Sequence, residues 1–327
     1  MTEQFLKLRD WIPLEKLNWS VLSQNPAAIQ LLEQNLNKID WDVLSLHTEA
    51  IQLLEQNPDK INWSRLSYNS AAIHLLEQNL DKIDWEYLSV NPKAIHLLEQ
   101  NPDKINWTSL SINPAAIHLL EQNKDKIYWY ALSKNPAAIH ILEQNSDKID
   151  WEFLSMNPAA IHLISEALEK NPDKIDWLML SKNPAAIHLI SKMLKQKPYK
   201  IDWKMLSLNP AAIHLLEKNP DKICWYWLCF NPKAIHILEK NLDKINWTVL
   251  SMNPAAIHLL EQNLDKIDWV GLSKNPAIFD YDYDKIREHM ESTGIKDELI
   301  AYYYRPENIH KFVERGDLLE DFNSRWN

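Results

Sequence analysis

The hydrophobic and polar positions of this chain follow one pattern that returns along most of its length. A stretch of the type NPAAIHLLEQN, complete at 253–263, begins at intervals of 22 residues, with two intervals of 26 residues. The starting positions are Asn25, His47, Asn69, Asn91, Asn113, Asn135, Asn157, Asn183, Asn209, Asn231, Asn253 and Asn275. A fixed period of this length is typical of stacked structural units, and we expect about twelve of them.

Each unit is predicted to form two short helices. Asn followed by Pro is a favourable start for the first helix, because the Asn side chain caps it and Pro presets the backbone. A second Asn, such as Asn35, ends this helix in a place where a left-handed residue is common. After a short loop, Asp or Asn caps a second helix of the form W-x-x-L-S. Neither helix is long enough to be stable alone in water, so stacking must stabilise both.

Helical spacing predicts which residues form the core. Ala28 and Leu32 share one face of the first helix, and the tryptophan shares a face with Leu44 in the second. A large aromatic ring in every unit supplies much of the burial that such short helices need. The predicted core tryptophans are Trp41, Trp63, Trp85, Trp107, Trp129, Trp151, Trp177, Trp203, Trp225, Trp247 and Trp269, with Trp19 preceding them.

The fold class predicted from this pattern is an all-α solenoid. Its repeats are expected to span residues 25–274, between an N-terminal cap at 1–24 and a helical C-terminal cap at 275–327. A leucine-rich-repeat horseshoe has a similar period, but it requires an L-x-L strand that is missing here. In the C-terminal cap we expect helices near 282–292, 296–304 and 306–315. The repeats starting at 157 and 183 each contain four extra residues, which predicts one additional turn on two adjacent helices.

Composition narrows the possible chemistry. With only three glycines, the chain has little scope for phosphate-cradling loops, and we expect no cofactor. A net charge of −10 disfavours nucleic acid and anionic membranes as partners. The two cysteines, Cys224 and Cys229, make no disulfide framework, and no signal peptide or spanning segment is evident. These features favour a soluble intracellular protein.

Nine histidines occupy one position of the first helix and could suggest a metal array. Helical phase places this position away from the core, and stacked helices lie too far apart for successive histidines to share one zinc ion. We therefore expect no metal site and no catalytic residues. The histidines are interpreted as a solvated or inter-repeat polar ladder, with a pH-sensitive surface as the alternative. Lys, Asp and Glu also recur, and such charges usually form weak surface pairs.

The positions that vary between units are the candidates for partner binding. They lie two and five residues after the tryptophan, on the side of the second helix opposite the core. Aromatic and Met side chains are enriched there, as at protein interfaces, although they could equally pack the edges of adjacent helices. The candidate partner-binding residues are Tyr68, Tyr87, Phe153, Met156, Met179, Met205, Trp227 and Phe230. The two lengthened helices, together with the aromatic segment CWYWLCF at 224–230, are the strongest candidate for a hot spot.

The repeat wording NPAAIHLLEQNPDKIDWxxLSxNP, followed by a tail from NPAIFDYDY to PENIHKFVERG, resembles repeat proteins of giant DNA viruses related to mimivirus and megavirus. That resemblance implies a location in the host cytoplasm, a viral factory or the virion, and it carries over no catalytic residue. We expect a non-enzymatic scaffold or adaptor that binds another protein. The alternative is a self-associating structural component of a virion or viral factory.

Overall fold

The computed structural model describes residues 5–196 and 198–295. The chain divides into two compact units: Pro13–Ile278, which holds the repeats, and a smaller unit formed by Met1–Ile12 with Phe279–Asn327. The first unit therefore begins 12 residues before the predicted start of the repeats (25 − 13) and ends four residues after their predicted end (278 − 274).

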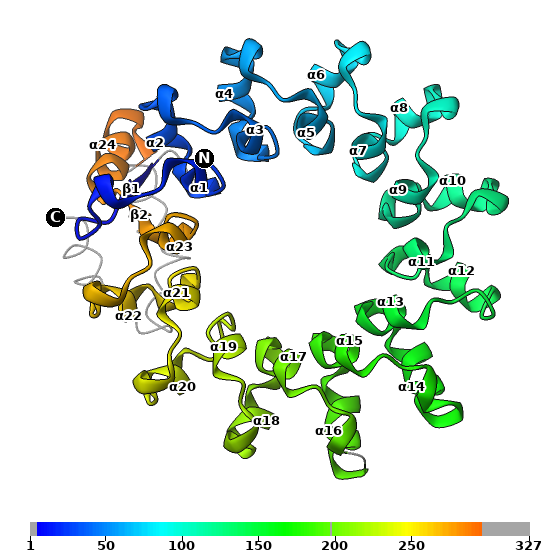
Figure 1. The fold of residues 1–327 in the computed structure, drawn as a ribbon. Coiled ribbons are helices and arrows are strands. Elements are labelled where there is room, and N and C mark those ends of the chain that lie inside the picture. Colours follow the sequence, from blue (N-terminus) through cyan, green and yellow to red (C-terminus); the bar gives the residue numbers. More distant parts are fainter. Residues whose placement is uncertain (1–4, 197, 296–327) are drawn as a thin grey trace, which may run out of the picture. The chain divides into compact units, whose positions relative to one another are not determined.

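Short helices of two kinds alternate along the larger unit (Figure 1), which confirms the predicted all-α solenoid. The Trp helices, each beginning at a repeat tryptophan, are α1 (Trp19–Leu22), α3 (Trp41–Leu44), α5 (Trp63–Tyr68), α7 (Trp85–Val90), α9 (Trp107–Ile112), α11 (Trp129–Leu132), α13 (Trp151–Met156), α15 (Trp177–Lys182), α17 (Trp203–Leu208), α19 (Trp225–Leu228), α21 (Trp247–Leu250) and α23 (Trp269–Ser273). The Ile helices are α2 (Ile29–Glu33), α4 (Ile51–Gln56), α6 (Ile73–Glu77), α8 (Ile95–Gln100), α10 (Ile117–Gln122), α12 (Ile139–Gln144), α14 (Ile161–Lys170), α16 (Ile187–Gln196), α18 (Ile213–Lys218), α20 (Ile235–Glu239) and α22 (Ile257–Glu261).

Single 3-10 turns connect these helices. The turns that lead into Trp helices are called lysine turns here, because each ends at a lysine. They are Leu14–Lys16, Leu36–Lys38, Pro58–Lys60, Leu80–Lys82, Pro102–Lys104, Lys124–Lys126, Pro172–Lys174, Pro198–Lys200, Pro220–Lys222, Leu242–Lys244 and Leu264–Lys266. Those that start at the Asn-Pro position are Pro26–Ala28, Thr48–Ala50, Pro114–Ala116, Pro136–Ala138, Pro158–Ala160, Pro184–Ala186, Pro210–Ala212, Pro254–Ala256 and Pro276–Ile278.

Leucine and alanine form the fully buried centre of the repeats. Ala28, Leu32 and Leu44 have no exposed surface, as the helical spacing predicted. The tryptophans, by contrast, are half-buried, so each keeps part of its ring at the surface. Tryptophan therefore forms the edge of the core, and aliphatic side chains form its centre.

The Asn-Pro position has two functions, of which the sequence revealed one. The Oδ1 atom of Asn113 accepts a hydrogen bond from the amide of Ala115 at 3.0 Å, which is the expected cap. Its Nδ2 atom donates to the carbonyl oxygens of Ser89 at 3.0 Å and Asn91 at 3.2 Å, both in the preceding repeat. Because Asn113 is fully buried, these bonds are strongly directional ties between repeats.

Serine provides a second tie between repeats. The Oγ atom of Ser111 donates to the carbonyl of Trp107 at 2.7 Å and accepts from the amide of Tyr128, in the next repeat, at 3.1 Å. Serine at this position is fully buried as well. The Ser and Asn side chains of S-x-N-P thus form hydrogen bonds with buried backbone groups of the neighbouring repeats, and neither side chain contacts solvent.

The expectation of a left-handed residue at the end of the Ile helix is wrong. Asn101, which ends α8, has φ −131° and ψ 61°, and no residue other than glycine has positive φ in the described ranges. The Nδ2 atom of Asn101 instead donates to the carbonyl of Leu97 at 2.9 Å. The side chain thereby satisfies one of the carbonyls that lack partners at a helix end.

The repeat array of the larger unit closes on itself. The amide of Asn18 donates to Ser273 Oγ at 2.8 Å, and Asn25 Nδ2 donates to the carbonyls of Ser273 and Asn275 at 3.2 and 3.1 Å. These are the same bonds that join successive repeats elsewhere, and α1 packs against α23 (Figure 1). The bond from a backbone amide to this serine recurs at all the remaining steps between repeats, and at one of them Cys229 replaces the serine. The sequence pattern did not reveal this closure.

The smaller unit contains a two-stranded sheet. Strand β1 (Leu6–Leu8) pairs antiparallel with β2 (Phe279–Tyr281), with Leu6 opposite Tyr281 and Leu8 opposite Phe279. The chain segments directly before and after the repeats are thus joined to each other. Helix α24 (Tyr283–Thr293) follows, in agreement with the first predicted tail helix. The helices expected at 296–304 and 306–315 lie outside the described residues.

The predicted additional turns are present. Helices α14 and α16 each contain 10 residues, whereas the other Ile helices contain five or six. These two lengthened helices are neighbours in the array, as the position of the insertions predicted.

Candidate interaction surface

Seven of the eight candidate partner-binding residues lie on Trp helices, and Phe230 lies in the turn directly after α19; they differ in exposure. Tyr68 and Tyr87 are exposed. The remaining six are half-buried: Phe153, Met156, Met179, Met205, Trp227 and Phe230. Tyr68 and Tyr87 are therefore directly accessible to a partner, whereas the other six side chains are partly covered by neighbouring repeats.

Contacts between adjacent Trp helices explain the half-buried group. The ammonium group of Lys134, five residues after its tryptophan, lies 3.7 Å from the ring centroid of Phe153 in the next repeat. At the equivalent pair, a Cβ atom added to Gly271 would lie 3.2 Å from the Cγ atom of Met252. Residues five positions after one tryptophan thus meet those two positions after the next.

The position directly after the tryptophan is more exposed than most of the candidate partner-binding residues, and the sequence analysis did not select it. Tyr130, Leu178, Tyr226 and Val270 all occupy it and are exposed. This position varies among repeats as much as the two that were chosen, so variability itself was the available signal. It was missed because the selection considered only two positions that share one helical face.

Three aromatic side chains gather on α19 and the turn directly after it, within the segment singled out as a hot spot. The ring centroid of Tyr226 lies 5.3 Å from that of Trp227 and 5.9 Å from that of Phe230, with nearly perpendicular planes. Trp227 and Phe230 are themselves 5.9 Å apart. Tyr226 is 47% exposed, so the cluster, called the aromatic cluster here, presents a large ring to solvent. Edge-to-face packing of this kind holds the rings in fixed positions.

The two cysteines that flank the aromatic cluster have structural positions. Cys229 is fully buried and replaces the linking serine, and burial raises the pKa of its thiol despite the nearby backbone amide of Asn246. Cys224 occupies the cap position of α19 without a side-chain capping bond. Both are free thiols, and a raised pKa makes Cys229 a poor nucleophile.

The histidine ladder connects repeats, as one of the two interpretations expected. In seven repeats the histidine Nε2 lies 2.5–2.9 Å from Glu Oε1, 19 residues earlier, and both side chains are exposed. The pairs are His74–Glu55, His96–Glu77, His118–Glu99, His140–Glu121, His162–Glu143, His236–Glu217 and His258–Glu239. Ser165 and Ser191 replace the glutamate in the lengthened helices, and Gln30 and Gln52 replace the histidine in the first two repeats.

The repeated lysine does more than form the weak ion pairs that were expected. In eight repeats its ammonium group lies 4.2–5.2 Å from the centroid of the preceding repeat's tryptophan, as with Lys38 over Trp19. This contact covers the half-exposed ring with a cation. In three turns that begin with Pro the lysine pairs instead with the Asp before it, at 3.2–4.0 Å.

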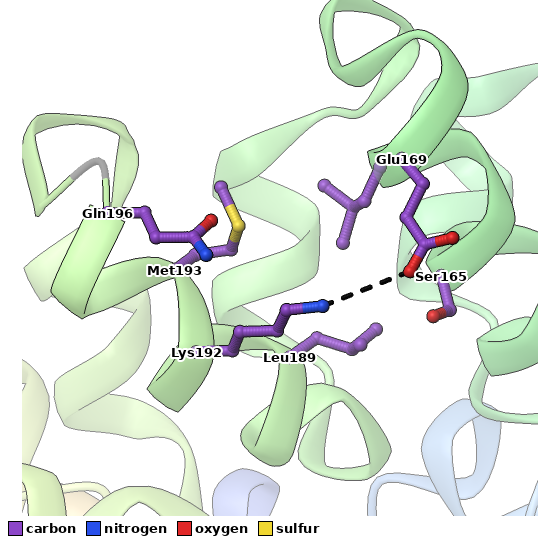
Figure 2. A pocket seen from close by; sticks show the side chains of 7 residues that line it. Ser165, Glu169, Leu189, Lys192, Met193 and Gln196 are labelled. Atoms are coloured by element: carbon purple, nitrogen blue, oxygen red, sulfur yellow. Dashed lines mark ion pairs between the residues drawn. The ribbon is translucent and has the colours of Figure 1, made fainter.

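The two lengthened helices border a small cavity of about 170 Å³. Leu168, Leu189 and Met193 give it apolar walls, and Lys192 lies 3.9 Å from Glu169 across it (Figure 2). Both charged groups are strongly solvated, and the cavity is smaller than the roughly 300 Å³ at which small-molecule sites begin.

In the ranges 5–196 and 198–295, no group of three or more His, Cys, Asp or Glu side chains could hold a metal ion. No helix in those ranges is long and apolar enough to cross a membrane. Comparisons with protein-family models, curated proteins and solved structures find no match.

Proposed function

We propose that this protein is a non-enzymatic scaffold or adaptor that binds a partner protein on the exposed surface of its Trp helices. The observation that carries the proposal is the aromatic cluster at the end of α19, in which Tyr226 is exposed beside Trp227 and Phe230. Tyr and Trp are the residues most enriched among binding hot spots, because they bury a large area with few rotatable bonds. Tyr130 with Phe153 and Lys134 forms a smaller group of the same kind.

A pre-ordered backbone supports this function. The helices that carry the rings are tied to both neighbours by buried Asn and Ser hydrogen bonds, as Asn231 is to the carbonyls of Ser207 and Asn209. A partner therefore has little backbone to order on binding, which favours affinity. The side chains that differ between repeats would determine which partner binds.

The resemblance to repeat proteins of giant viruses suggests where the scaffold acts. On that basis the partner would be a host or viral protein in the cytoplasm of an infected cell or in a viral factory. The proposal requires no cofactor, nucleic acid or membrane.

The decisive experiment is affinity purification with the full chain from infected cells. The double substitution Trp227→Ala/Phe230→Ala removes two rings of the aromatic cluster, and Ser109→Ala/Ile112→Ala changes the same two positions in a repeat where neither position is aromatic. We expect a stoichiometric protein partner that the first variant loses and the second retains. Recovery of only capsid proteins, or of further copies of this chain, would favour a structural virion component instead.

A further inference from the structure

Charge is distributed unevenly among the repeats, although the chain as a whole has a net charge of −10. When each repeat between Trp19 and Asp268 is counted from its tryptophan to the residue before the next one, only three have a net positive charge, and they are consecutive. They span 177–246, called the basic sector here, and contain 11 lysines against five carboxylates, a net charge of +6 (11 − 5). The repeats on either side, 151–176 and 247–268, have net charges of −3 (2 − 5) and −2 (1 − 3).

Two lysines of the basic sector pair with the acidic repeat that precedes it. Lys192 lies 3.9 Å from Glu169, and Lys200 lies 3.7 Å from Asp173. The other nine lysines (11 − 2) still exceed the five carboxylates of the sector. The positive excess therefore remains after these contacts between repeats are set aside.

Three exposed lysines of the basic sector lie on or just after the Trp helices α15, α17 and α19, the last of which carries the aromatic cluster. Lys204 has the same position in α17 that Tyr226 has in α19, and these two helices pack against each other (Figure 1). Lys233 lies in the turn after Phe230, and Lys182 ends α15. None of the three lysines has an ion pair within the part of the chain that the structure describes.

The row of carboxylates that cap the Trp helices is interrupted at the aromatic cluster. Asp150, Asp176 and Asp202 cap α13, α15 and α17, and each accepts a hydrogen bond from an amide of its own helix. Cys224 and Asn246 occupy this position in α19 and α21. Among the capping residues of α17, α19 and α21, only Asp202 therefore contributes a negative charge.

The other charges of the two repeats 203–246 balance one another. Each lysine turn beside α19 contains one Asp and one Lys, Asp221 with Lys222 in one and Asp243 with Lys244 in the other. The Ile helices α18 and α20 each end with a Glu followed by a Lys, and they lie on the other side of the array (Figure 1). The positive excess of these two repeats therefore comes from the two lysines beside the aromatic cluster.

We infer that the protein segment bound at the aromatic cluster is acidic: an apolar side chain contacts Tyr226, and neighbouring carboxylates pair with Lys204 and Lys233. This inference rests on the proposed function, because it specifies the partner of the same surface. The ring supplies buried area, and the lysines determine which segments fit, since a basic segment is repelled and a neutral one leaves both charges without a partner.

A nucleic acid strand or an anionic membrane fits this surface less well than an acidic protein segment. Binding of single strands needs several ring faces open to successive bases, whereas Trp227 and Phe230 are half-buried and pack against Tyr226. The acidic repeats 151–176 and 247–268 would repel phosphates that extend beyond the basic sector. A short segment with a few carboxylates avoids both.

The test selects peptides from a random library displayed on phage, with the full chain as the target. A length of about 12 residues exceeds the span of three neighbouring Trp helices, at roughly 8–10 Å per helix and about 3.3 Å per extended residue. Clones are retained if they bind the natural chain and lose binding to Tyr226→Ala, which changes an exposed residue, or to Trp227→Ala/Phe230→Ala. We expect Asp and Glu to be enriched about twofold or more in the retained clones relative to the unselected library.

Synthetic peptides from the retained clones then test the lysines by fluorescence anisotropy. Lys204→Gln/Lys233→Gln should weaken binding about fivefold to tenfold, because it removes two charge pairs. Lys218→Gln/Lys240→Gln is the matched control, since it removes the same charge from the same two repeats at exposed residues of the Ile helices. The control should change the affinity by less than about twofold. Equal losses in the two variants would show that only net charge matters, and would overturn the inference.

The selection separates a failure of this inference from a failure of the proposed function. Retained clones without enrichment of Asp and Glu would overturn the inference and leave the proposed function in place. If no clone depends on the aromatic cluster, the proposed function fails, and the inference fails with it. Binding of a labelled poly(dT) strand, or flotation with phosphatidylserine vesicles, that is lost in Lys204→Gln/Lys233→Gln would assign the surface to nucleic acid or lipid. Either result would overturn the assignment to an acidic protein segment.

Discussion

At the scale of single residues, the polar residues that recur in each repeat have different hydrogen-bonding roles. Asparagine occurs as a helix cap in two places, yet only the Asn of the Asn-Pro pair also donates to backbone carbonyls of the preceding repeat. At the cap of the Trp helix, Asp and Asn interchange freely, as in Asp84 and Asn106, because only an acceptor is needed there. The Asn-Pro position never contains Asp, which fits its need for a donor.

Asn113→Asp is therefore predicted to destabilise the protein strongly. The carboxylate keeps the cap to Ala115 but turns an oxygen toward the carbonyls of Ser89 and Asn91, in a fully buried place. Loss of two hydrogen bonds and burial of an unpaired acceptor cost about 3 kcal/mol or more. Asn106→Asp should change the free energy of unfolding by less than about 0.5 kcal/mol. Urea unfolding of both variants measures the contrast, and equal losses would refute the assigned roles.

His47→Asn is predicted to stabilise the protein. His47 stands at the Asn-Pro position without a side-chain capping bond. Asparagine there would restore the cap and the hydrogen bonds to the backbone of the preceding repeat. The gain in the free energy of unfolding is expected to be about 1–2 kcal/mol.

The pH dependence of stability gives a second test of this position. Burial lowers the pKa of His47, whereas the nearby Glu49 carboxylate raises it by a smaller amount. The unfolded chain consequently binds the proton more tightly, and acid favours unfolding below the ordinary pKa of about 6.5.

The difference in free energy of unfolding between His47→Asn and the natural chain should therefore widen as the pH falls from about 7.5 to about 5.5. Because the other histidines are the same in both proteins, the comparison isolates position 47. A difference that stays constant or narrows over this range would contradict the assignment.

At the scale of helices, the sequence predicted the elements better than their contacts. Periodicity located both helices of each repeat and the lengthened α14 and α16, because helix formation depends on local spacing and caps. It did not predict Lys38 over Trp19 or His74 beside Glu55, because those pairs depend on how far one repeat is displaced from the next. The exposed Tyr226 was missed because the candidates came from two positions on one helical face, although the sequence shows that its position varies as well.

Trp107→Ala tests how helices of adjacent repeats stabilise each other. The ring is half-buried with Lys126 4.6 Å from its centroid, so the expected cost is about 3 kcal/mol, the low end for loss of a large aromatic side chain. Lys126→Ala alone should cost about 0.5–1 kcal/mol, and nothing further once Trp107 is absent. A double-mutant cycle by thermal unfolding measures this coupling; additive losses would show that the lysine acts independently of the ring.

At the scale of the whole repeat array, closure is the property that the pattern could not predict. The repeat sequence indicates how one unit packs on the next. Whether the last unit meets the first depends on the small rotation between adjacent repeats, summed over the whole array. Two of the bonds that form the seam link residues 248 and 250 positions apart. Closure pairs the first and last Trp helices, which an open solenoid would leave without a neighbour on one side.

Asn25→Asp distinguishes a closed array from an open one in solution. Asn25 has the same partners at the seam, the carbonyls of Ser273 and Asn275, that Asn113 has within the array. If the array is closed, the substitution should cost nearly as much as Asn113→Asp, about 3 kcal/mol. If the first repeat were free, its side chain would be hydrated and the cost would fall below about 0.5 kcal/mol. Urea unfolding of the two variants side by side decides between these outcomes, because both substitutions preserve the local cap and differ only in what lies on the other side.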